Sequence, residues 1–274
     1  MKHVVGLFIL SAFTLISCEK EEDENELNPG EEYQETLIDE KIDVGNPFFT
    51  VTPDTLYKNI YRMAWTGTKL WAITDLQGNG GAAQLLMEID KTNGNVLQSL
   101  TPAKAMWCLD YANGNLWDIS TFSAPGEQKF AETFDPNTGS YIGKWNYNGQ
   151  YDLYYYFTYD GAKYWGETNY DCGGSNCQSL VTYDLQGNIV AENAASYEYE
   201  DLVFGGDHFW ASRGQGIILK LDKNFQVVRT IKINDYQKFG EVNYANEISM
   251  HLEYIDSNLW ILDRFNNFYK TGIQ

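Results

Sequence analysis

Five tryptophans recur at regular intervals, and the residues nine and ten positions before them include most of the side chains that could bind a ligand. These tryptophans are Trp71, Trp117, Trp165, Trp210 and Trp260. The candidate binding residues are Tyr61, Arg62, Trp107, Tyr155, Tyr156, Glu200, Asp201 and His251. Their aromatic rings can stack on sugar rings, and their charged groups can hold a polar ligand. The set predicts a ligand-binding site, with a polar, tyrosine-rich surface that binds nothing as the alternative.

The sequence also offers carboxylates that could transfer protons, but no complete catalytic motif. Glu200, Asp201 and Glu253 are the candidate acids or bases for a cyclotransferase, lactonase or lyase reaction. There is no nucleophile elbow, P-loop, HExxH or CxxC motif, and only His208 and His251 lie beyond the N-terminal segment. We therefore predict ligand binding without catalysis, metal or cofactor. An enzyme that uses one of these carboxylates is the alternative.

Three cysteines lie beyond the N-terminal segment. Cys172 and Cys177 flank a short glycine-containing loop, and we expect them to form a disulfide in an oxidising compartment, with free thiols as the alternative. Cys108 follows a candidate binding residue and is expected to be a small buried hydrophobic residue.

Each recurring tryptophan belongs to a unit of 45–50 residues that predicts four β-strands. An apolar strand, a turn rich in Gly, Asn and Asp, and a second strand with the tryptophan open each unit. An aromatic residue stands six positions before each tryptophan and an apolar residue eight positions before it, which is the two-residue period of a strand. A second hairpin follows, for example at residues 89–94 and 134–139. Such a unit is typical of a propeller blade, with the tryptophan packed between blades.

The predicted fold is therefore all-β, a five-bladed β-propeller of four-stranded antiparallel blades over residues 35–274. After Trp260 there is too little chain for a complete fifth blade. We expect the missing edge strand to come from the N-terminal side, between Thr36 and Val44, because this would remove an open sheet edge. Residues 45–60 could instead hold part of a sixth blade, although they contain no tryptophan or Asp-Gly hairpin.

The N-terminal residues predict a signal peptide. Residues 4–16 carry no charge, and this stretch is too short to cross a bilayer but suits a signal-peptide core. It ends in Leu15-Ile16-Ser17-Cys18, which resembles the lipobox of bacterial lipoproteins. The resemblance implies that residues 1–17 are removed and that acyl chains such as palmitate on Cys18 anchor the protein in the outer membrane. A buried helix or an ordinary secretory signal is the alternative.

An acidic, flexible tether is predicted over residues 18–34. Residues 19–40 hold eleven acidic side chains and one lysine, and their mutual repulsion favours an extended chain. Lys20-Glu21-Glu22 resembles the export signal of surface lipoproteins in Bacteroidota, which implies a protein facing the cell exterior. The formal net charge of −19 disfavours a nucleic-acid partner. The expected partners are the membrane, through the lipid anchor, and a glycan or an outer-membrane protein.

The five units and the short closing blade resemble five-bladed propellers such as the plant-type glutamine cyclotransferases, and more loosely the YncE-like and NHL-like propellers. The resemblance covers most of residues 35–274 and rests on blade spacing. Residues 200–202 and 251–253 echo the Asn-Glu-Leu-Glu stretch of the cyclotransferases, whereas Ala72 stands where that family typically has an acidic residue. The resemblance implies the propeller fold, and cyclotransferase chemistry only where the carboxylate is retained.

Overall fold

The computed structural model divides the chain into two units, residues 1–33 and 34–274, and all the residues it describes belong to the second. The described residues are 37–52, 57–76, 84–102, 106, 108–119, 128–149, 153–171, 176–194, 199–239 and 250–274. The predicted signal peptide and tether lie outside them. So does the expected disulfide, because Cys172 is not described and only the backbone of Cys177 is. None of the helices in the described part is long and apolar enough to cross a membrane.

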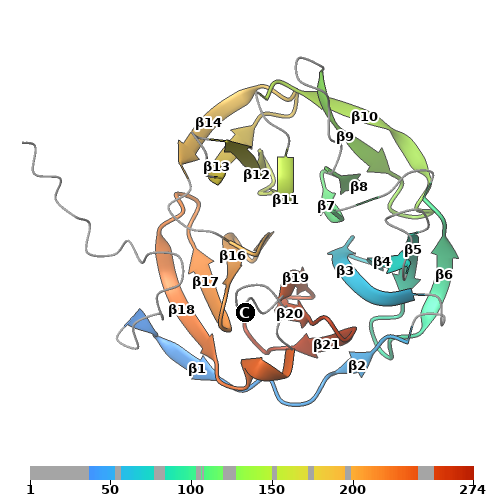
Figure 1. The fold of residues 1–274 in the computed structure, drawn as a ribbon, viewed down its shortest axis with the longest axis vertical. Coiled ribbons are helices and arrows are strands. Elements are labelled where there is room, and N and C mark those ends of the chain that lie inside the picture. Colours follow the sequence, from blue (N-terminus) through green and yellow to red (C-terminus); the bar gives the residue numbers. More distant parts are fainter. Residues whose placement is uncertain are drawn as a thin grey trace, which may run out of the picture. The chain divides into compact units, whose positions relative to one another are not determined.

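Five antiparallel sheets of four strands stand in a ring around a central axis (Figure 1), which confirms the predicted five-bladed propeller. The first blade consists of β3 (Tyr57–Trp65), β4 (Leu70–Leu76), β5 (Leu85–Ile89) and β6 (Val96–Leu100). The second consists of β7 (Asp110–Ala112), β8 (Asn115–Asp118), β9 (Lys129–Phe134) and β10 (Tyr141–Tyr147). The third consists of β11 (Leu153–Tyr159), β12 (Tyr164–Asp171), β13 (Asn176–Tyr183) and β14 (Ile189–Ala194).

The fourth and fifth blades complete the ring. The fourth consists of β15 (Asp201–Gly205), β16 (His208–Arg213), β17 (Ile217–Leu221) and β18 (Val227–Ile233). The fifth consists of β19 (His251–Ile255), β20 (Asn258–Leu262), β21 (Asn267–Lys270) and β2 (Phe49–Thr50). A short 3-10 helix, η2 (Tyr236–Phe239), follows the fourth blade.

An N-terminal strand closes the ring, but it is not the one that the sequence predicted. The outer strand of the fifth blade is β2, in which Phe49 pairs with Phe268 and Thr50 with Asn267. The predicted segment instead contains β1 (Glu40–Ile42), which adds a parallel fifth strand to β18 of the fourth blade. Residues 45–60 therefore do not hold part of a sixth blade in the described structure. They supply the closing strand and the beginning of the first blade.

The repeated tryptophans lie between neighbouring blades, as predicted, and none is more than 9% exposed. Trp71, for example, packs in a cluster that joins Ile73 and Leu86 of the first blade to Leu116 and Phe134 of the second. Burial of these large rings removes apolar surface that an isolated four-stranded sheet would leave in water. The blades are therefore stable only as a ring.

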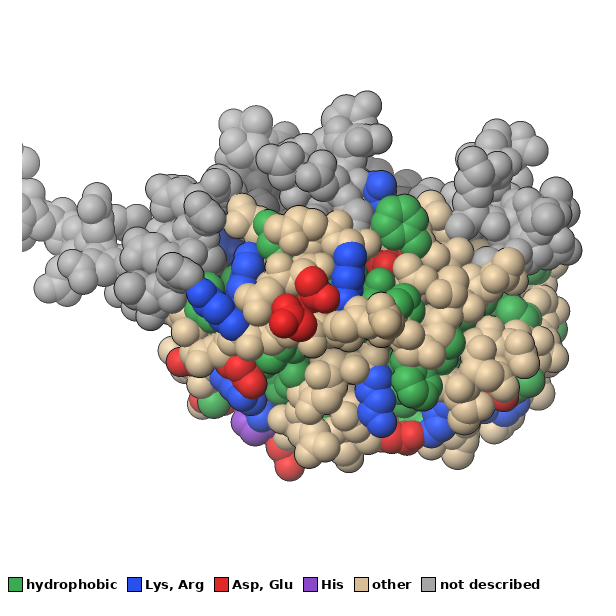
Figure 2. Space-filling model, turned by 90° about the horizontal axis from the view of Figure 1, so that it is seen from below, with side chains coloured by type: hydrophobic (Ala, Val, Ile, Leu, Met, Phe, Trp, Pro, Cys, Tyr) green, Lys and Arg blue, Asp and Glu red, His purple; other side chains and the backbone are tan. Residues whose placement is uncertain are grey.

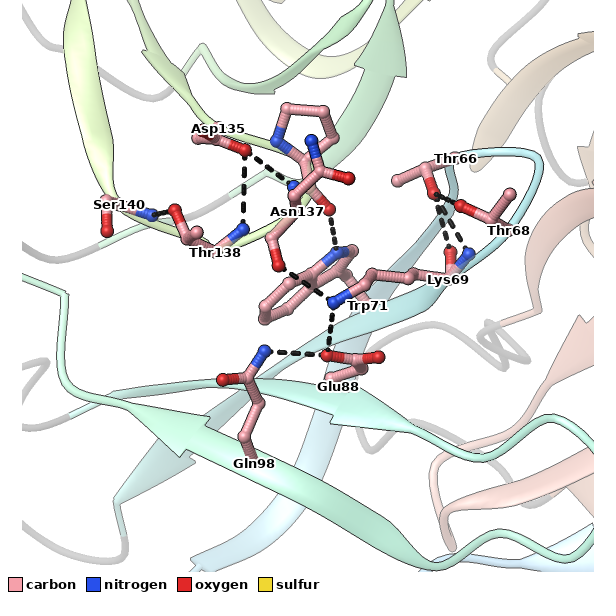
Figure 3. A network of polar contacts seen from close by, with 11 residues as sticks. Thr66, Thr68, Lys69, Trp71, Glu88, Gln98, Asp135, Asn137, Thr138 and Ser140 are labelled. Atoms are coloured by element: carbon pink, nitrogen blue, oxygen red, sulfur yellow. Dashed lines mark hydrogen bonds and ion pairs between the residues drawn. The ribbon is translucent and has the colours of Figure 1, made fainter.

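Polar contacts complete the joint between the first two blades (Figure 3). The Trp71 Nε1–H group donates to the carbonyl oxygen of Pro136 at 2.9 Å. The Lys69 ammonium donates to Glu88 Oε2 and to the carbonyl oxygen of Asn137, each at 2.8 Å. Gly139 ends this turn at φ +69°, and a Cβ there would lie 2.5 Å from Leu100 Cδ1. A turn of one blade thus fits closely onto the face of the preceding blade, which fixes the spacing of the ring.

Figure 2 shows the side of the ring where β1 and β2 lie. Charged side chains of both signs are interspersed there, and hydrophobic side chains appear only in small areas. Arg229 and Glu40, for example, form an exposed ion pair where β1 meets β18. The described surface in this view has no large apolar patch of the kind that marks a protein interface.

Candidate functional site

The inner strands β3, β7, β11, β15 and β19 stand around the central axis of the ring (Figure 1). Residues of these strands and beside them line two spaces in the channel along this axis, so that their side chains form layers. We call the end at which these strands begin the strand-start end, and the end at which they turn into the second strands the hairpin end. The layer nearer the strand-start end takes one residue, nine positions before each repeated tryptophan, from every blade. These residues are Arg62, Cys108, Tyr156, Asp201 and His251.

Three members of this layer, from three different blades, are in direct contact. Arg62 Nη1 lies 3.1 Å from Asp201 Oδ1 and 2.6 Å from His251 Nδ1. Asp201 Oδ2 accepts the backbone N–H of Leu252 at 2.8 Å. The Arg62 and Asp201 side chains are only 11% and 10% exposed. Because a guanidinium group only donates, His251 accepts at Nδ1 and is neutral in this arrangement.

Charge and burial set the protonation of this cluster. Burial alone would raise the pKa of Asp201, but the positive charge of Arg62, the nearby His251 ring and the hydrogen bond from the Leu252 amide hold that pKa below its ordinary value. Burial and the positive charge of Arg62 lower the pKa of His251, although Asp201 partly opposes this. At neutral pH the cluster is therefore a carboxylate and a guanidinium with a neutral imidazole.

The other predicted site residues divide into buried, half-buried and undescribed groups. Tyr156 is 2% exposed, and burial together with the negative charge of Glu167 raises its pKa well above the ordinary value. Tyr61 and Glu200 are half-buried, and the Glu200 backbone N–H donates to the carbonyl oxygen of Ser212 at 2.9 Å. Trp107 and the side chain of Tyr155 lie outside the described residues. The structure thus brings Arg62, Asp201 and His251 together, but as partners of one another.

The next layer toward the hairpin end contains two further carboxyl groups. Asp110 and Glu253 stand seven positions before their tryptophans, on β7 and β19. Burial raises the pKa of Glu253 well above its ordinary value, and the charges of Asp110 and Asp201 add to this rise. Burial likewise raises the pKa of Asp110, with Asp201 adding to the rise while Arg62 and the backbone N–H of Tyr111 oppose it. Both groups are therefore biased toward the neutral carboxylic acid, which can donate a hydrogen bond.

A cavity of about 290 Å³ lies at the hairpin end, beside these two carboxyl groups. Every blade contributes one half-buried aromatic ring to it, from the position six residues before the repeated tryptophan. The five rings belong to Trp65, Tyr111, Tyr159, Phe204 and Tyr254. We call this cavity, with its five rings and the carboxyl groups of Asp110 and Glu253, the aromatic cup.

The inner walls of the blades hold the cup's rings in place. Tyr254 stacks on Trp210, with ring centroids 6.3 Å apart, and lies against Gly205, where a Cβ would be 2.1 Å from Tyr254 Cγ. Tyr159 packs on Tyr164, with centroids 5.1 Å apart. One part of each of these rings thus belongs to the core, while another part lines the cup.

A much smaller space of about 10 Å³ adjoins the cup toward the strand-start end, and Asp110 and Glu253 line both. Its other lining residues include Arg62, Tyr156 and Asp201. That volume holds about one water molecule. Within the described channel, room for an organic ligand therefore exists at the hairpin end.

The sequence pattern contained the cup residues, but we interpreted their spacing only as evidence for a strand. An aromatic residue six positions before every tryptophan satisfies the strand period, and the same period holds whether the ring lies between blades or at the end of the channel. The five-fold recurrence of an aromatic ring at the last or last-but-one position of the inner strands is the signal that could have identified the cup. Among the described residues, no three His, Cys, Asp or Glu side chains are placed to hold a metal ion.

No family model and no curated protein matches this sequence. Among solved structures, the chain is similar to a glutaminyl cyclase from Myxococcus xanthus, at 13% identity over 82% of this chain and 97% of the cyclase, with a TM-score of 0.52. It is also similar to the Dos1 propeller, at 10% identity over 78% of this chain and 68% of that one, with a TM-score of 0.40. The computationally designed protein Ika4 gives 11% identity over 69% of this chain and 99% of that one, with a TM-score of 0.35. At such low identity, the similarity to the cyclase shows a common propeller fold alone.

Proposed function

We propose that this propeller binds a ligand in its central channel without catalysis, as the folded part of a lipid-anchored protein at the cell surface. The observation that carries the binding proposal is the aromatic cup, to which all five blades contribute a half-buried ring. Partly exposed aromatic rings around a concave space are typical of sites for organic ligands. The surface location rests on the sequence alone, on Ser17-Cys18 and on Lys20-Glu21-Glu22.

Catalysis is the second candidate, because Asp110 and Glu253 are carboxyl groups with raised pKa values beside a cavity. Such groups can act as general acids near neutral pH. One solved propeller of similar fold is a glutaminyl cyclase, so release of ammonia from peptides with an N-terminal glutamine is the reaction to test first.

A ligand screen on the full chain, purified in detergent, tests the binding proposal. Glycans, peptides, amines and organic acids are added in turn, and the shift in the unfolding midpoint is measured for the wild type and two single variants. Tyr159→Ala removes a ring at the hairpin end, whereas Trp107→Ala removes one of the residues predicted for the strand-start end. We expect a ligand that stabilises the wild type and the Trp107→Ala variant but not the Tyr159→Ala variant. If no compound stabilises the wild type, the binding proposal is wrong.

Ammonia release by the wild type and by Glu253→Gln separates the two candidate functions. We expect no release by either protein. Turnover by the wild type that is lost in Glu253→Gln would establish the catalytic candidate and overturn binding without chemistry.

Two further variants test the proposed location. Cys18→Ala should move the protein out of the membrane fraction. Replacement of Lys20, Glu21 and Glu22 by Ala should protect the protein from protease added to whole cells. If the protease still removes the protein with the altered tether, the surface-export proposal fails.

A further inference from the structure

The lining of the aromatic cup has a definite electrostatic sign. Its described residues include three acidic side chains, Asp110, Asp160 and Glu253, and no lysine, arginine or histidine. The lining also presents five aromatic rings, whose faces carry partial negative charge. A carboxylate, phosphate or sulfate ligand would therefore meet no cation in the described lining and would face the negative faces of the rings.

Ammonium groups of this chain already lie over two of the five rings. Lys91 Nζ is 4.4 Å from the ring centroid of Trp65, and Lys223 Nζ is 5.4 Å from that of Phe204. Lys91 also pairs with Asp256 of the fifth blade, and Lys223 pairs with Asp207 of the fourth blade. The two lysines and their acidic partners do not line the cup. At the hairpin end, each of these two ammonium groups thus lies between an aromatic ring and a carboxylate. This arrangement is typical of cation–π recognition.

The two carboxyl groups at the base of the cup have no cation of their own at hydrogen-bond distance among the described contacts. Asp110 Oδ1 accepts the backbone N–H of Tyr111 at 2.6 Å, and Glu253 accepts backbone N–H groups of Trp65 and Tyr254. Arg62, the nearest cation in the adjoining layer, is paired with Asp201. The carboxyl groups of the cup are therefore available to a cation that enters it.

We propose that the aromatic cup binds an organic cation, an alkylammonium or quaternary ammonium group, which lies among the five rings and faces the carboxyl groups of Asp110 and Glu253. A cavity of about 290 Å³ is at the small end of the range for ligand pockets and suits such a head group. This inference rests on the proposed binding function and names the class of ligand.

Binding of a cation should be linked to proton release. Because Asp110 and Glu253 are biased toward the neutral acid, a cation beside them favours loss of a proton from one of the two. The other titratable or charged groups of the cup lining are Tyr111, Tyr159, Asp160 and Tyr254. The small adjoining space is lined by Arg62 on β3, Cys108 just before β7, Tyr156 on β11 and Asp201 on β15, and His251 on β19 contacts Arg62 and Asp201. Cys108 and Tyr156 stay neutral and Asp201 stays ionised at neutral pH. Protonation of His251 at low pH would weaken cation binding further, so both effects have the same sign.

Choline and its neutral carbon analogue 3,3-dimethylbutan-1-ol are the probes for this proposal, because they differ in charge and scarcely in shape. Calorimetric titration of the full chain should show that choline binds at least about tenfold more tightly than the alcohol, a difference of about 1.4 kcal/mol. The affinity for choline should rise between about pH 5 and about pH 8, with protons released to the buffer. Equal binding of the two probes, or an affinity that falls as the pH rises, would overturn the proposal.

Variants show whether the cup is the site. Tyr159→Leu should weaken choline binding about tenfold or more, and Glu253→Gln should reduce both the affinity and the proton release. Tyr141→Leu is the matched control, since Tyr141 is 50% exposed on an outer strand and should not affect binding. A loss of binding as large in Tyr141→Leu as in Tyr159→Leu would place the site outside the cup and overturn the proposal.

The screen described above distinguishes failure of this inference from failure of the proposed function. If a saccharide or an anion binds in a manner that depends on Tyr159 while choline does not bind, the cation assignment is wrong and the binding function stands. If no compound binds the wild type, both are wrong.

Discussion

The two layers of the central channel differ in how their buried carboxyl groups are stabilised. Near the strand-start end, Asp201 is ionised and is paired with Arg62 at 3.1 Å. One layer toward the hairpin end, Asp110 and Glu253 have no such partner among the described residues, and burial raises the pKa of both groups. The comparison shows that a buried carboxyl group in this channel either acquires a cation or keeps its proton. The first arrangement stabilises the ring of blades, and the second leaves a site that a cation from outside can complete.

Loss of the internal cation should have the largest effect. In Arg62→Met the Asp201 carboxylate would remain buried without its positive partner, so the free energy of unfolding should fall by about 3–5 kcal/mol. Urea denaturation measures this change. Arg229→Met is the control, because the Arg229 and Glu40 side chains are 40% and 36% exposed and their pairing contributes less than about 1 kcal/mol. Equal losses in the two variants would mean that the buried cluster contributes no more than a surface ion pair.

A methyl group at Gly205 should disturb the hairpin end without touching the charged cluster. In Gly205→Ala the new Cβ would lie 2.1 Å from Tyr254 Cγ, so this ring must move from its place in the cup. We expect a loss of about 1–3 kcal/mol in the free energy of unfolding, measured in urea, together with loss of choline binding.

Gly143→Ala is the matched control for this second change. Gly143 also lies in a strand, and a Cβ there would meet nothing within 4 Å. Its free energy of unfolding should change by no more than about 0.5 kcal/mol. If Gly205→Ala behaved like this control and still bound choline, the position of Tyr254 would not depend on its contact with Gly205.

The fold was predictable because each blade repeats the same pattern of strands and buried aromatic rings. A large ring at a fixed place in each unit must be buried, and four-stranded sheets stacked around one axis bury all five rings in the same way. The closing strand was misplaced for a physical reason. Phe49–Thr50 is too short to show any period, whereas residues 40–42 resemble a strand and pair elsewhere.

The candidate site was predictable only in part. The repeat correctly aligned Arg62, Asp201 and His251 at one level of the channel, because equal spacing from the tryptophan means equal depth along the axis. Sequence alone could not show that these groups would bind one another, because the distance between facing side chains depends on how closely the blades approach the axis. The aromatic cup could not be predicted for the same reason. A two-residue period predicts on which face of a strand a side chain lies, but not whether there is a cavity at the end of the strand.

The dependence of stability on pH should have opposite signs for the two layers. The pKa of Glu253 in the folded protein lies above its ordinary value near 4.5. The stability that the protonated Glu253 contributes is therefore complete below about pH 4.5 and is lost as the pH rises toward the folded pKa. The glutamine of Glu253→Gln does not titrate, so the free energy of unfolding of this variant should increase with pH relative to that of the wild type, by at most about 1.4 kcal/mol per pH unit.

The pKa of His251 in the folded protein lies below 6.5. The stability that the neutral His251 contributes is therefore complete above about pH 6.5 and is lost as the pH falls. The free energy of unfolding of His251→Gln should therefore increase relative to that of the wild type as the pH falls. Urea denaturation of the three proteins between about pH 4.5 and about pH 7.5 measures both slopes. Slopes of the same sign would mean that the two layers do not differ in how they hold protons, and the contrast between a self-paired layer and one that awaits a cation would be wrong.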